Sequence, residues 1–213
     1  MDEYLAEIIG LLCAEGSYIL QYSTYYGYDR NKLRLFRNHK SERIEFYNKD
    51  NKLLLHYKKL LLLKFNYDSH ITKNNKINIC NRKIIQTILG YTKLGHLKWE
   101  IPKDILNSRK SVKLSFIWGY FDGDGTCVTS VRMFSTNKKG LSQVSKILTQ
   151  LDIKHTLQKP ILKENRKPIY TLQVSHASKE TFLKEVKPIS ILPGARINSI
   201  WYWIPLSKAW SNA

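Results

Sequence analysis

Two stretches of the chain repeat one arrangement of apolar, small and acidic positions. Residues 5–17 read LAEIIGLLCAEGS, and residues 116–128 read FIWGYFDGDGTCV. When their last matching glycines are aligned, each stretch carries a glycine, then a small residue, then an acid. The matched pairs are Gly10 with Gly119, Ala14 with Gly123, and Glu15 with Asp124. A pattern that occurs twice in one chain predicts two copies of one structural unit.

The apolar spacing predicts that each stretch lies on a mostly buried helix. Residues 2–13 and 112–122 carry large apolar side chains on most sides of a helical wheel. The helices stop near Gly16 and Gly125, and we expect a left-handed backbone there, because helices commonly end on a left-handed glycine.

The repeat continues beyond the helices. Residues 46–53 align without gaps to residues 134–141, which pairs Phe46 with Phe134. Each copy then continues with a helix, strand-like alternation, a second helix and a Trp-Ile-Pro-like segment. In the first copy these four segments are residues 53–65, 70–80, 82–89 and 99–102. In the second copy they are residues 141–153, 155–175, 179–186 and 203–205. The pattern predicts an α+β chain with pseudo-twofold symmetry, with halves 1–106 and 107–213.

The glycines and acids have a joint physical meaning. Gly10 and Gly119 each lie four residues before another small residue, so each helix has a face on which a second backbone can approach closely. Packing the two helices together would bring Glu15 and Asp124 side by side at two helix C-termini, where negative charge is unfavourable. A divalent cation would remove that repulsion. Oxygen ligands without His or Cys favour Mg²⁺, and such a site suits phosphodiester hydrolysis.

The charge identifies the class of partner. The chain has 35 Lys and Arg against 17 Asp and Glu, a formal charge of +18, with 43% hydrophobic residues. A basic chain that can bury a core predicts binding to nucleic acid. No apolar run is long enough to span a membrane, and the acidic start does not suit a signal peptide, so we expect an intracellular, non-secreted protein. The cysteines, Cys13, Cys80 and Cys127, are predicted to be reduced thiols.

The two repeated stretches resemble the motif of the LAGLIDADG homing endonucleases. IIGLLCAEG (8–16) and IWGYFDGDG (117–125) match it at the glycine, small, acid and final glycine positions, and the likeness extends over nearly the whole chain. The single-chain, two-motif members are most similar. The resemblance implies two α-β-β-α-β-β-α halves, with the motif helices packed at their interface and two antiparallel β saddles facing DNA.

The resemblance also implies roles for residues. Glu15 and Asp124 would be the catalytic, metal-binding acids, with the backbone carbonyls of Ala14 and Gly123 as further ligands. Two or three Mg²⁺ ions would bind, and Mn²⁺ or Ca²⁺ could substitute in binding. Lys98, before an Ile-Pro pair, matches the family's basic catalytic residue. Its second-half position holds Trp201, so Arg196 and Lys187 are alternatives there. Asp122 pairs with Cys13 and is interpreted as a hydrogen-bonding residue at the helix end.

Two ribbons of the sequence are predicted to hold the DNA. Residues 18–50 alternate basic and apolar positions, and residues 154–175 form a second ribbon in which Thr171 and Gln173 should face outward. The predicted DNA-binding residues are Lys32, Arg34, Arg37, Lys40, Arg43, Lys159, Lys163, Arg166, Thr171 and Gln173. The spacing from Glu15 to Phe46 is 31 residues but from Asp124 to Phe134 only 10, which predicts a longer reading element in the first half.

The sequence therefore predicts a site-specific, divalent-metal-dependent DNA endonuclease, a monomer encoded in an intron. It would make a staggered double-strand cut in a long, non-palindromic target, since a fused pseudo-dimer need not read a palindrome. An RNA-binding intron maturase and a DNA-binding regulator without nuclease activity are the alternatives. The two retained acids argue against the regulator.

Overall fold

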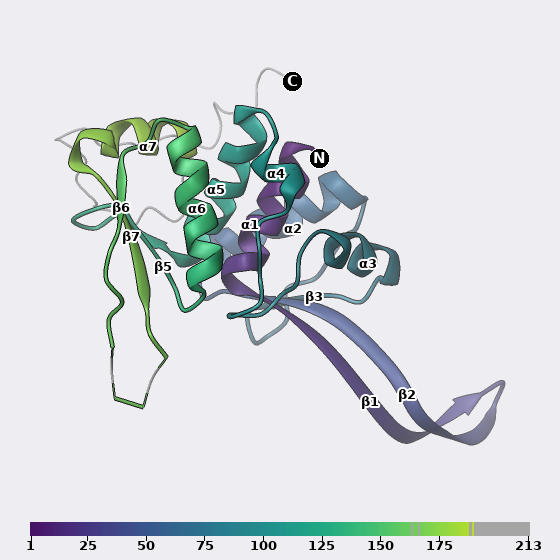
Figure 1. Cartoon of the computed structure of the whole chain (residues 1–213). Helices are drawn as coiled ribbons and strands as arrows, with labels where there is room; N and C mark the ends of the chain where they lie inside the picture. Colours follow the sequence, from purple (N-terminus) through teal and green to yellow (C-terminus); the bar gives the residue numbers. More distant parts are fainter. Residues whose placement is uncertain (163, 166, 188, 190–213) are drawn as a thin grey trace.

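The structure is a computed structural model and describes residues 1–162, 164–165, 167–187 and 189 (Figure 1). It is an α+β fold whose order repeats a helix, two strands and a helix in each half. The helices are α1 (Glu3–Glu15), α2 (Asn51–Phe65), α3 (Arg82–Tyr91), α4 (Lys103–Leu106), α5 (Lys110–Asp124), α6 (Lys138–Gln150), η1 (His176–Ser178) and α7 (Lys179–Val186). The strands are β1 (Gly16–Asp29), β2 (Lys32–Tyr47), β3 (Lys76–Ile79), β4 (Gly125–Thr126), β5 (Arg132–Ser135), β6 (His155–Leu157) and β7 (Tyr170–Val174).

Helices α1 and α5 pack side by side along the centre of the molecule, as the repeated glycines predict. A Cβ atom at Gly10 would lie 2.3 Å from the carbonyl oxygen of Phe116, and one at Gly119 would lie 2.3 Å from that of Glu7. Only hydrogen fits at these two positions, so the helix backbones touch there. The contact is nearly the same seen from either helix, which is the mark of the pseudo-twofold axis.

The ends of these two helices differ from the prediction. Gly16 has φ −87° and ψ 145°, and Gly125 has φ −104° and ψ 165°, so both are extended and not left-handed. The chain passes from the helix straight into a strand, which requires extended backbone. Glycine is still needed, because a Cβ at either position would lie 2.4 Å from the carbonyl oxygen of Leu12 or Phe121.

The helices lie on one side of two antiparallel sheets. In the described part of the chain, one sheet has the order β1-β2-β3 and the other the order β4-β5-β7-β6. A single bridge from Ile71 to Ile77 marks the position of a fourth strand in the first sheet. Hairpin β1–β2 extends far from the body, and the segment from β6 to β7 extends in another direction (Figure 1).

The strand register corrects the alignment of the two halves by one residue. Gly16 pairs with Phe46, whereas Gly125 pairs with Met133, so Met133 and not Phe134 is the counterpart of Phe46. Phe46 and Met133 are both fully buried, and the N-caps of α2 and α6, Asp50 and Asn137, keep the same offset. The gapless alignment matched two phenylalanines by residue type, but burial determines which position is equivalent.

Helix α1 contributes to two hydrophobic cores. Ile8, Leu11 and Leu12 pack with α2, α3 and the first sheet, while Ile9 and Cys13 pack with α5 and the second half. A hydrogen bond between the side chains of Glu7 and His56 also joins α1 to α2. One helix therefore serves both halves, which is why they form one fused globule.

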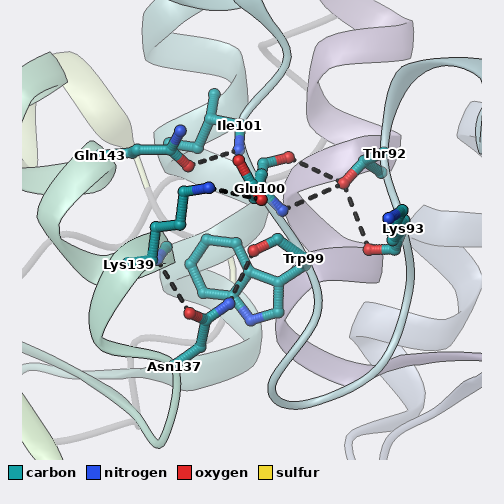
Figure 2. Close-up of polar contacts among 9 residues, drawn as sticks. Thr92, Lys93, Trp99, Glu100, Ile101, Asn137, Lys139 and Gln143 are labelled. Carbon is teal, nitrogen blue, oxygen red and sulfur yellow. Dashed lines mark hydrogen bonds and ion pairs between the residues drawn. The ribbon is translucent and has the colours of Figure 1, made fainter.

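The segment before α4 crosses onto the second half (Figure 2). The Asn137 side chain donates to the carbonyl oxygen of Trp99 at 2.6 Å, and the amide N–H of Ile101 donates to Gln143 at 2.8 Å. The Trp99 ring lies over Gly140, where a Cβ would come within 2.4 Å of it. The predicted boundary at residues 106 and 107 stays a prediction, but the packing of Trp99 already belongs to the second core.

A helix that crosses a membrane has to be both long and apolar. None of the helices in the described ranges meets both conditions.

Candidate active site and nucleic-acid interface

Two carboxylates meet where α1 and α5 end. Glu15 is the last residue of α1 and Asp124 the last of α5, so each points from a helix C-terminus next to the start of a strand. A Cβ on Gly123 would lie 2.4 Å from the Cβ of Ala14 and 3.2 Å from the Cγ of Glu15. The small residue in each copy therefore allows the approach of the two acids.

The acids influence one another electrostatically. Burial, and after it the charge of Glu15, raises the pKa of Asp124 from 3.8 to about 8. Burial also raises the pKa of Glu15. Removing water from a carboxylate disfavours its charged form, and a second carboxylate nearby adds repulsion. The pair is thus held in a geometry that is unfavourable for two bare anions.

The oxygen atoms at this point fit a hard divalent cation. Among the described residues, no cluster of three or more His, Cys, Asp or Glu side chains surrounds a common point. Mg²⁺ favours a site with two carboxylates in which backbone carbonyl oxygens and water complete the coordination shell, because Mg²⁺ keeps several of its waters. Asn48 donates to Glu15 at 3.4 Å and helps to orient that side chain.

Asp122 has the hydrogen-bonding role that its position in the motif suggested. Its side chain is buried, and its Oδ1 accepts from the backbone N–H of Ile189 at 2.9 Å. It ties the segment after α7 to the end of α5. Cys13, at the matching place in α1, is buried, and burial raises the pKa of its thiol.

The predicted basic catalytic residues lie in different places. Lys98 is exposed in the turn at residues 96–98, and its backbone N–H donates to the carbonyl oxygen of Gly95 at 2.8 Å. This turn contacts the second half, because the hydroxyl of Thr136 donates to the carbonyl oxygen of His96. Lys187 is exposed at the end of α7. Arg196 and Trp201, like the segment 203–205, lie outside the described residues.

The register of hairpin β1–β2 separates its two faces. Ile44 and Phe46 point towards the helices and are buried. Neighbouring residues of a strand point to opposite faces, so the residues of β2 that alternate with Ile44 and Phe46 point to the other face, which is open. Their partners in β1 point to the same open face. Arg43 lies on that open face. A bulge near Thr24 shifts the register beyond it, but the ring of Tyr25 still contacts both His39 and Phe36. The open face therefore continues to the tip.

Three of the five basic residues predicted in this hairpin lie on the open face. They are Lys32, Arg34 and Arg43. Lys40 pairs with Tyr22 and shares the opposite face with Ile44, so it does not point with the other three. Arg37 lies in the bulge, outside the regular register. The alternation in the sequence could not reveal this, because the side-chain period is two and the bulge interrupts it.

The open face also carries polar residues that sequence reasoning did not single out. They are Ser17, Gln21, Ser23, His39 and Ser41. Each occupies a position of the same alternation as Arg43. The signal was present in the sequence, but only the register shows which set of alternate residues faces outward. Gln and Ser side chains can donate to and accept from base edges.

The second ribbon corrects the prediction for Thr171. Gln173 lies on the open face, where Gln158 donates to it at 2.8 Å. Thr171 lies on the same side but is only 2% exposed, so it cannot contact DNA in this structure. It is a short side chain in a central strand, paired with the larger Phe134. Lys159 is exposed, whereas Lys163 and Arg166 lie outside the described residues.

Comparison with known proteins agrees with this architecture. Residues 111–187 match the family of LAGLIDADG-like domains. Structures of mesophilic variants of the homing endonuclease I-DmoI superimpose with a TM-score of 0.62 at 18% identity, covering 86% of this chain and 94% of that chain. The fold is that of the single-chain, two-motif LAGLIDADG homing endonucleases. Comparison with curated protein sequences gives no match.

Two further structures share this LAGLIDADG fold. I-DmoI in complex with DNA and Mn has a TM-score of 0.62 and 18% identity, covering 86% of this chain and 96% of that chain. A K262A mutant of I-SmaMI has a TM-score of 0.50 and 11% identity, covering 89% and 86%. At these identities the likeness establishes the LAGLIDADG fold, and the activity has to be argued from the site.

Proposed function

We propose that this chain is a site-specific, divalent-metal-dependent DNA endonuclease that makes a staggered double-strand cut in a long, non-palindromic target. The observation that carries the proposal is the pair Glu15 and Asp124, held together at the ends of two touching helices. The raised pKa of Asp124 supports it, because the chain keeps two acids where they are unfavourable without a cation. The net charge of +18 and the basic open face of β2 supply a surface for DNA.

Each residue has a part in this proposal. Glu15 and Asp124 would hold Mg²⁺ with the carbonyl oxygens of Ala14 and Gly123, and Asp124 must give up its proton to do so. A divalent ion held there would supply a water of lowered pKa and charge stabilisation at the leaving oxygen. Lys98, exposed in its turn, would bind phosphate oxygens near the cut.

The proposal also covers how many copies of the chain act together and where the protein acts. One chain carries both motif helices, so a monomer has both acids and no second copy is needed. We infer an intracellular protein encoded in an intron, acting wherever the host DNA lies. The structures of I-DmoI with DNA and metal show that this fold accommodates such a complex in that protein.

Cleavage and binding separate the proposal from its alternatives. We expect Glu15→Gln and Asp124→Asn each to abolish double-strand cleavage while changing DNA affinity by less than about tenfold, since the acids serve chemistry more than binding. The assay uses a randomised duplex library with and without Mg²⁺, followed by gel-shift measurement on the selected target. If both variants cut the duplex at the wild-type rate, the catalytic site is not at Glu15 and Asp124. Binding of intron RNA without any duplex cleavage would support the maturase.

A further inference from the structure

A cleft opens at the outer edge of β2, just beyond the point where β3 ends. Strand β3 pairs with β2 from Ile44 to Tyr47, and the edge of β2 before Ile44 has no β3 partner within the described residues. The β2-edge cleft has a volume of about 500 Å³ and is lined by Lys40, Ser41, Glu42, Arg43, Cys80 and Arg82. It is separate from the carboxylate pair, and it shares Ser41 and Arg43 with the open face of the hairpin.

The lining of the β2-edge cleft is cationic. Three of its six residues are basic and one is acidic, and the Arg43 guanidinium is already paired with Glu45 at 2.8 Å. The Glu42 carboxylate accepts from the Tyr18 hydroxyl at 3.0 Å, while Lys40 and Arg82 lie farther away, at 3.7 and 3.8 Å. The Lys40 and Arg82 side chains are 50% and 76% exposed, so these long ion pairs leave both groups accessible. The cleft therefore offers two accessible cations, Lys40 and Arg82, around one acid that is already hydrogen-bonded.

The place of the cleft on the ribbon indicates which anion it meets. A two-stranded ribbon is about 5 Å between strand axes, and the major groove is about 12 Å wide, so a ribbon lying along the groove turns its face to the bases and its edges to the walls. The walls are the sugar–phosphate backbones. Arg43 and its open-face neighbours would then meet base edges, while cations at the β2 edge would meet phosphates.

We propose that the β2-edge cleft binds a backbone phosphate of duplex DNA, held by the side chains of Lys40 and Arg82. The inference rests on the proposed function and adds an anchoring site to it. It also gives Lys40 a role that differs from base reading, since Lys40 points away from the open face. A contact to phosphate positions the ribbon without carrying sequence information.

Cys80 allows this proposal to be tested on the folded, full-length protein. Cys80 is exposed in the cleft, whereas Cys13 and Cys127, the other two cysteines of the chain, are buried. Two methanethiosulfonate reagents of similar size attach either a negative sulfonatoethyl group or a positive trimethylammonioethyl group to this thiol. The two adducts differ mainly in charge, so they separate an anion site from simple crowding.

We expect the sulfonate adduct to weaken duplex affinity about tenfold or more for every sequence, because it places a competing anion beside Lys40 and Arg82. The trimethylammonium adduct should stay within about twofold of the untreated protein. Cys80→Ser should bind DNA normally and respond to neither reagent. Equal weakening by both adducts, or no effect of the sulfonate, would overturn the phosphate site while leaving the endonuclease proposal intact. Failure of the untreated protein to bind any duplex would overturn both.

A second measurement uses the salt dependence of binding. Arg82→Ala and Lys40→Ala should each make the negative slope of log affinity against log salt shallower by about 0.9, with an unchanged base preference. Arg109→Ala is the matched control. Arg109 is an exposed arginine at the start of α5 and pairs with Glu3 at 2.8 Å, whereas Asp124 is at the end of α5. The same slope in all three variants would show that the cleft meets no phosphate.

Discussion

Hairpin β1–β2 has strands of 14 and 16 residues, whereas its counterpart β4–β5 has strands of only 2 and 4. The bases of the two hairpins agree, with Gly16 opposite Phe46 and Gly125 opposite Met133. The base is fixed because Phe46 and Met133 fill the cores under the sheets. Beyond the base the first hairpin leaves the body, and its length is free to change without altering the cores.

If the chain cuts DNA as proposed, this difference would let its two halves read two DNA half-sites unequally. The two halves are symmetric where they meet each other, at the touching helices and the paired acids. Asymmetric parts lie at the periphery, where packing imposes little. From Glu15 to Phe46 the chain takes 31 positions, and from Asp124 to Met133 only nine, so the corrected register makes the asymmetry slightly larger than the sequence alignment suggested.

The largest effect on stability should come from the symmetric helix contact. Gly10→Leu and Gly119→Leu should each lower the free energy of unfolding by about 1–3 kcal/mol or more, because each side chain would enter the opposite backbone. Chemical denaturation measures both. Gly90→Ala is the control, since nothing lies within 4 Å of its added Cβ, and it should be neutral or stabilising by up to about 1 kcal/mol. If only one of the two leucine variants loses stability, the helix contact is not symmetric.

Shortening the long hairpin should remove the difference between the halves. Gln21 pairs with Ser41, so residues 22–40 can be replaced by a two-residue Asn-Gly turn. The chain should still fold, because Ile44 and Phe46 remain in place, but duplex affinity should drop at least about tenfold as phosphate and base contacts are lost. Measuring cleavage of all single-base variants of the selected target gives the base specificity at each position of both half-sites. An unchanged profile in both half-sites would show that the hairpin reads no bases.

A single arginine should have a narrower effect. Arg34→Ala should cost about 1–3 kcal/mol at one base pair if the guanidinium reads guanine bidentately, and should relax specificity there alone. Leu33→Ala is the matched control, because Leu33 lies next to Arg34 on the opposite face. Binding to target variants measures both. If Leu33→Ala changes the base profile and Arg34→Ala does not, the faces are assigned the wrong way round.

The smallest effect concerns pH and the acid pair. The pKa of Asp124 is higher in the folded protein, about 8, than its ordinary 3.8, so the folded state binds this proton more tightly. Without metal, stability should therefore fall as pH rises from about 4 to about 8. Melting curves of the wild type and Asp124→Asn measure this, and the variant should show the flatter dependence. Added Mg²⁺ should stabilise the wild type more than the variant at pH 8. Equal slopes would mean that the pKa of Asp124 is not raised in the folded protein.

The motif pattern alone predicted the centre of this protein. A helix face of small residues and an acid one position further are local features with a fixed helical period, so the pattern by itself predicts the helix contact at Gly10 and the meeting of Glu15 with Asp124. The charge of the chain likewise needs only counting. These inferences hold because each motif helix carries its small residues and its acid at the same fixed helical spacing.

Only the tertiary structure decided how distant segments meet. Burial shows that Met133 is the counterpart of Phe46, that Thr171 is covered, and that Lys40 leaves the open face. Strand β3 stops before Cys80, and that ending opens the β2-edge cleft. The alternation of a strand gives two faces but does not say which is covered, because that depends on elements far away in the chain. The sequence determined the paired helices and acids, and the packing of the sheets determined which side chains around them are exposed.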